Sequence, residues 1–282
     1  MYSLAVAFIV GLIFIFFPPL LGLFGYSWSV LPGIFLGIGC FVYLNRRFAK
    51  KVEALVHLAN ESVQAAQNLG QRGGGQKGSH KLMIEKKIEQ AVDILKQGFQ
   101  YEKWQVGASV SLNAQIGMIL FSQYIFTQKG KKGRVAEAIP YLENSMVHGA
   151  PAKLMQGLWH SWIRLAVCYF LIEQNFDKTI ETMEKIAKVA HKEGFVWAVY
   201  AWFYVKTNKT DEALEILVRG VEKAPSDQKL TELLNALRNG KKLQMGTVYG
   251  NHWWGLGLEK PKHLNPTAQM GHPRMKGRSM RR

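Results

Sequence analysis

The first 45 residues have no charged side chains: no Asp, Glu, Lys or Arg occurs between Met1 and Asn45. A helix needs roughly 20 apolar residues to cross the hydrocarbon core of a bilayer. The uncharged stretch is long enough for two crossings and too long for one helix unless that helix is strongly tilted. We therefore predict a transmembrane hairpin with spans over about 2–24 and 29–45.

A signal peptide fits this stretch poorly, because it has no basic start and no A-x-A-like cleavage site. The polar and aromatic residues at 25–29, followed by Pro32, favour a turn between the two spans. Two interpretations of Pro18 and Pro19 remain. They kink the first span, or they form the turn of a shallow re-entrant hairpin.

The basic residues RRFAKK at 46–51 follow the second span directly. Lys and Arg beside a membrane end mark the cytoplasmic side. The sequence therefore predicts a two-span, multi-pass membrane protein whose remaining residues are cytoplasmic, with a bacterial inner membrane as the plainest setting. A helix and a Gly-rich linker are expected over 46–80.

Cysteine is scarce, and familiar catalytic patterns are missing. Cys40 and Cys168 form no disulfide framework and suit a reducing compartment. The sequence has no H-E-x-x-H, G-x-S-x-G or G-x-G-x-x-G motif and no cysteine pair with zinc spacing. The glycines at 70–75 resemble a phosphate loop, but Gln76 occupies the position of its lysine. We predict no enzymatic activity, cofactor or metal.

The net charge of +16 is unevenly distributed, since residues 240–282 carry nine basic side chains and one acid. Their composition predicts a disordered tail that binds anionic lipid, with nucleic acid as the less favoured polyanion. Within this tail, GNHWWGLGL at 250–258 contains Trp253 and Trp254. Three interpretations remain: this segment docks back on the preceding domain, enters a membrane interface, or is a linear motif for a partner.

The residues from 81 to 239 have helical periodicity throughout, and within them a period of 34 residues relates 163–191 to 197–225. Such a period fits pairs of short helices that stack on one another. Four residues of one second helix follow their equivalents by this period: Ala213, Leu217, Gly220 and Pro225 follow Thr179, Met183, Ile186 and His191.

The stretch 194–227 resembles a tetratricopeptide repeat in its order of large, small and aromatic residues, and 160–193 resembles another. The resemblance departs from the family pattern at Thr179, where Ala is usual, and at His191, where Pro is usual; it weakens upstream of 160. It implies an all-α protein in which a two-helix transmembrane hairpin precedes a tetratricopeptide-like α-solenoid over 81–239, with a cap helix at 230–237. The residues that carry it are Trp197, Tyr200, Ala201, Tyr204, Ala213, Leu217, Gly220 and Pro225.

Tetratricopeptide arrays bind peptides or helices in a groove lined by the first helix of each pair. The resemblance therefore implies a membrane-anchored scaffold that binds a partner protein, with polyanion binding through the tail as the alternative. Arg164 and Lys206 would hold a carboxylate or an acidic peptide, and Trp202 would be an apolar anchor. The alternative for these three is packing and solvated charge. The groove candidates are Ser161, Arg164, Cys168, Ala198, Trp202 and Lys206.

Overall fold

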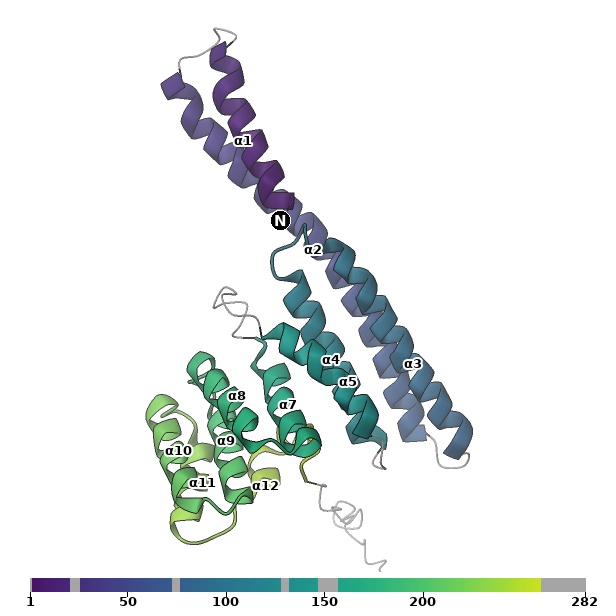
Figure 1. Ribbon diagram of the computed structural model, residues 1–282, viewed down its shortest axis with the longest axis vertical. Coiled ribbons are helices and arrows are strands. Elements are labelled where there is room, and N and C mark those ends of the chain that lie inside the picture. Colours follow the sequence, from purple (N-terminus) through teal and green to yellow (C-terminus); the bar gives the residue numbers. More distant parts are fainter. Residues whose placement is uncertain (1, 21–25, 73–76, 128–131, 147–156, 260–282) are drawn as a thin grey trace, which may run out of the picture.

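The computed structural model describes residues 2–20, 26–72, 77–127, 132–146 and 157–259 (Figure 1). Every regular element in these ranges is helical, which confirms the all-α prediction. The chain begins as a long rod and ends in a compact group of short helices beside one end of it.

The rod is formed by α1 (Tyr2–Leu20), α2 (Tyr26–Arg72) and α3 (Lys77–Gln97). Helix α1 packs along the first part of α2, and α3 packs along the last part (Figure 1). Small residues let α1 and α2 approach closely. A Cβ atom added to Gly37 would lie 3.1 Å from the carbonyl oxygen of Ala7, and one added to Gly11 would lie 3.2 Å from that of Gly33.

The predicted transmembrane hairpin is wrong, and so is the two-span membrane localisation. Among the residues that the structure describes, no helix is both long and apolar enough for a membrane crossing. The uncharged stretch is divided between α1, of 19 residues, and the beginning of α2, a helix of 47 residues with Pro32 inside it. Since α2 continues without a break into the charged residues from Arg46, the orientation inferred from 46–51 loses its basis.

The structure also places the residues on which the hairpin prediction depended. Pro18 and Pro19 belong to the last turn of α1, and Tyr26 begins α2. The intervening residues 21–25, which include the start of the expected turn, lie outside the described residues. So do residues 73–76 of the expected linker, of which α2 and α3 take the flanking parts.

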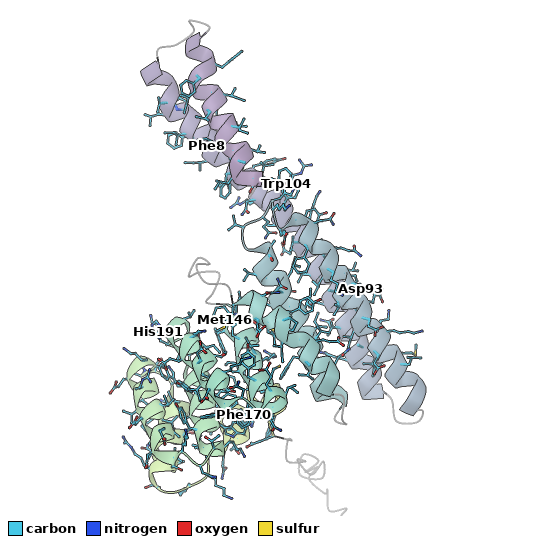
Figure 2. All side chains as sticks on the ribbon, in the orientation of Figure 1. Phe8, Asp93, Trp104, Met146, Phe170 and His191 are labelled. Carbon is cyan, nitrogen blue, oxygen red and sulfur yellow. The ribbon has the colours of Figure 1, made fainter. Side chains whose placement is uncertain are left out.

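A turn over 98–107 fastens the middle of the rod, where α1 begins, to the next helices. The backbone N–H of Tyr2 donates to the carbonyl of Lys103 at 2.6 Å, and that of Val106 donates to Oδ1 of Asn45 at 3.1 Å. The ring of Trp104 stacks on that of Phe48 with centroids 4.9 Å apart. Figure 2 shows Trp104 at this junction. The turn contains η1 (Gly98–Tyr101) and leads into α4 (Ala108–Thr127), which packs against α5 (Lys132–Ser145).

Two consecutive helix pairs and a closing helix form the compact group. Helix α7 (Trp159–Cys168) runs on as a π-helical turn, η2 (Tyr169–Glu173), and pairs with α8 (Phe176–Val189). Helix α9 (Gly194–Lys206) pairs with α10 (Thr210–Lys223), and α11 (Gln228–Arg238) covers both. Side-chain oxygens of Asn175 and Asp227 cap α8 and α11 by accepting backbone N–H groups, as residues at this position commonly do.

Helix α9 is the centre of this group, because every residue from 194 to 203 is buried. A helix that is apolar on all sides must be covered on all sides. Helices α8, α10 and α11 pack against it. Gly220 of α10 lets the two helices of the second pair meet, since a Cβ atom there would lie 2.6 Å from Cβ of Trp197.

The remaining face of α9 is covered by the C-terminal part of the chain. Instead of the expected disorder, residues 240–259 are folded, with α12 (Met245–Tyr249) and α13 (Asn251–Trp254). Residues 260–282, with most of the basic side chains of the predicted tail, lie outside the described residues.

We predict that Gly220→Ala destabilises the protein by about 1–3 kcal/mol, because the added methyl group overpacks the contact with Trp197. Gly39→Ala is the matched control: Gly39 also lies inside a helix, and nothing lies within 4 Å of the added atom. The control should be neutral or gain up to about 1 kcal/mol from helix propensity. Denaturant unfolding followed by circular dichroism measures both, and equal stability of the two variants would contradict the packing argument.

Candidate functional site: a groove that holds the C-terminal segment

The C-terminal segment, defined as residues 245–259, lies across the first helices of both pairs, α7 and α9. Met245 and Trp253 have no exposed surface, and Leu256 is 2% exposed. Gly250, with φ of +52°, makes the turn between α12 and α13 in a conformation that favours glycine. The segment is therefore packed as core.

Aromatic rings make most of this contact. The ring of Trp253 meets that of Trp202 edge to face at 5.0 Å between centroids, and Tyr249 meets Phe195 in the same way at 5.1 Å. His252 lies 5.9 Å from Phe195. Edge-to-face pairs add about 0.5–1.5 kcal/mol each beyond the area that they bury.

The segment ends at Glu259, whose carboxylate contacts the side chains of Trp202, Trp253 and Lys206. One Glu259 oxygen accepts the indole N–H of Trp202 at 3.3 Å, and the other accepts that of Trp253 at 3.0 Å. The ammonium of Lys206 lies 4.0 Å from Glu259 and 5.0 Å from the centre of the Trp202 ring. Both indole N–H groups and the lysine ammonium therefore interact with the same carboxylate.

The structure brings three of the predicted groove residues to the segment. Trp202 and Lys206 hold Glu259 and Trp253, and Arg164 lines a pocket with His252 and Leu256. Trp202 is nevertheless only 4% exposed, so the segment covers it.

The other three groove candidates are buried. Ser161 donates to the carbonyl of Leu158 at 2.6 Å, and Ala198 has no exposed surface. Burial raises the pKa of the Cys168 thiol to about 12, so this side chain remains a neutral thiol. None of the three therefore presents an exposed surface to the groove.

The two tryptophans of the predicted tail motif have different surroundings. Trp253 enters the groove, whereas Trp254 is partly exposed and packs on Gly246 of the segment itself, where a Cβ atom would overlap its ring. Of the three interpretations of GNHWWGLGL, the structure shows docking on the preceding domain.

Sequence reasoning missed Glu259 and the histidines of the site. Glu259 is the one acid among residues 240–282, and its position directly after an aromatic motif was an available signal. The nearly parallel rings of His160 and His252 lie 6.4 Å apart, although 92 positions separate the two residues in the chain. That pairing has no local signature.

The pKa of His160 is lowered to about 4, mainly because burial disfavours the charged imidazolium, with the positive charge of Arg164 and the neighbouring His252 acting in the same direction. The imidazole is therefore neutral at pH 7. No group of three or more His, Cys, Asp or Glu side chains placed to hold a metal occurs within the described ranges. The site offers hydrogen-bond donors, one guanidinium and apolar side chains, and these groups are suited to binding a ligand.

Comparison with protein-family models, with curated proteins and with solved structures gives no match. The resemblance to tetratricopeptide repeats therefore stays a prediction. The alternative of polyanion binding depends mainly on residues 260–282, beyond the part of the chain that the structure describes.

We predict that Trp253→Ala weakens docking of the segment by about 3 kcal/mol or more, because a fully buried indole is lost. The expected result is a loss of roughly a hundredfold or more in hydrogen-exchange protection of the amides of 251–257. Trp254→Ala removes a neighbouring, partly exposed indole and should cost less. The opposite order of the two variants would contradict the docked geometry.

A second prediction concerns His160. Because the unfolded chain takes up this proton near pH 6.5 and the folded chain only near pH 4, the free energy of unfolding should fall as the pH drops between these values. His160→Gln should lose less stability between pH 7 and pH 4.5 than the parent protein. His191→Gln, a change of an exposed histidine outside the groove, should behave as the parent does in the same denaturant titrations.

Proposed function

We propose that the protein is a non-enzymatic helical-repeat adaptor that binds a peptide segment with a buried aromatic side chain followed by a carboxylate. The observation that carries this proposal is the segment already in the groove. Its Trp253 is fully buried against Trp202, and its Glu259 accepts two indole N–H groups beside Lys206.

The repeat arrangement supports the proposal. The helix pairs α7–α8 and α9–α10 follow one another, and the segment crosses α7 and α9, the helices that line the groove in tetratricopeptide arrays. On this proposal, the two pairs are repeats of that type and α11 is their cap. The groove is then the family's ligand site, and residues 245–259 are an internal ligand.

The internal ligand determines which partners fit. Each partner must displace the segment, so it must offer comparable chemistry: an aromatic ring for the space over Trp202 and an acid for its indole N–H and Lys206. Aromatic anchors in buried pockets commonly contribute 2 kcal/mol or more to binding. Acidic, aromatic peptides are therefore the expected partner class, and Lys206 disfavours basic peptides.

The test uses a fluorescent peptide with the sequence of residues 245–259 and the full chain. The parent protein should bind it weakly, because its own segment occupies the groove. The double variant Trp253→Ala, Glu259→Gln should bind it at least tenfold more tightly by fluorescence anisotropy, since the internal ligand is weakened.

Two controls show where the peptide binds. The double variant with Trp202→Ala added should lose the gained affinity, and a peptide in which the residues equivalent to Trp253 and Glu259 are replaced should not bind. Circular dichroism checks that each variant is folded. Equal affinity of the parent and the double variant, or no binding by either, would overturn the proposal.

A further inference from the structure

A pocket of about 190 Å³ lies beside the docked segment, and its walls come from two separate parts of the chain. Helices α7 and α9 form one wall, and residues 251–256 of the segment form the other. The lining includes both polar and apolar side chains. The polar lining residues are His160, Arg164, Asn251 and His252, and the others are Ile163, Phe195, Leu256 and Gly255.

Arg164 brings a positive charge to this pocket. Within the described part of the chain, no carboxylate forms a salt bridge with it. Its guanidinium donates to the carbonyl of His160 at 2.7 Å, lies 3.9 Å from the sulfur of Met118 and sits 5.8 Å from the centre of the Phe121 ring. None of these contacts is a carboxylate. A partly buried guanidinium keeps several N–H donors, and its planar fork suits a carboxylate.

The two histidines provide further N–H donors to the pocket, and His160 does so without adding a charge. The imidazole of His160 is neutral at pH 7, because its pKa is about 4. A neutral imidazole has one N–H donor and one acceptor nitrogen. His252 is exposed at the pocket rim, with its ring nearly parallel to that of His160. Arg164 supplies the fixed positive charge, and this matches a monoanion.

We infer that this pocket is a binding site for a small organic monocarboxylate. Arg164 would take the carboxylate in a two-fold hydrogen bond, the two imidazoles would donate beside it, and the apolar part would lie against Ile163, Phe195 and Leu256. An inorganic phosphate would bring a second charge without a partner and would make no use of the apolar lining residues.

The site requires the docked segment, because half of its wall belongs to residues 251–256. A ligand that binds only this closed arrangement stabilises it, and by reciprocity the docked segment raises the affinity for the ligand. The carboxylate would thus act as a regulator of groove access. The site itself does not depend on whether another peptide ever replaces the segment.

In the test, the full chain is titrated separately with acetate, butyrate and inorganic phosphate. Binding is measured from the histidine ring signals in NMR spectra. Butyrate should give a saturable shift of the His252 signal and bind about fourfold more tightly per methylene group than acetate. Arg164→Gln should weaken butyrate binding at least tenfold. Arg219→Gln, whose guanidinium is paired with Glu184 outside the pocket, should bind butyrate as the parent does.

A second variant guards against misfolding of Arg164→Gln. His252→Gln changes an exposed side chain at the pocket rim and should also weaken butyrate binding, by at least threefold, measured by thermal shift. No saturable binding, binding unchanged in both variants, or phosphate binding as tight as that of butyrate would overturn the inference. The peptide experiment is read independently, since it requires no carboxylate in solution.

Discussion

Helix α9 is apolar on every side, and the rest of the compact domain is arranged to cover it. Burial of apolar surface is the main favourable term in folding, so a helix with no polar face is stable only when it is enclosed. Helices α8, α10 and α11 enclose most of α9. The open side, where a stack of helix pairs leaves its groove, is covered by residues 245–259 through Trp253 and Tyr249. The need to cover α9 therefore explains why residues 245–259, which include four glycines, are folded.

Local patterns in the sequence were sufficient to predict the helices and their pairing over 159–238. Gly220, one of the residues that define the period of 34, lies at the contact between α9 and α10. Contacts between distant residues were not predictable in this way. The pairing of His160 with His252 and the meeting of Trp202 with Glu259 depend on how the chain returns to α9, for which no periodicity exists.

The N-terminal residues show a different reason for failure. Hydropathy averages a stretch of sequence without regard to where helices begin and end. Here the boundaries matter, because α2 joins its apolar beginning to its charged remainder in one continuous helix. The close contacts of Gly11, Gly33 and Gly37 with the facing backbone show that α1 and α2 are fitted to each other. Glycine spacing was visible in the sequence, but the partner of each glycine was not.

Helix α11 ends at Arg238 and α12 begins at Met245, and this short connection has a thermodynamic consequence. On the proposed function the segment is a tethered ligand, and a ligand tethered this closely has an effective local concentration on the order of millimolar. A free peptide of equal intrinsic affinity would have to approach that concentration to occupy half of the grooves. Dilute, weak ligands would thus leave the segment in place. Only a partner that binds much more tightly, or is itself held nearby, would displace it.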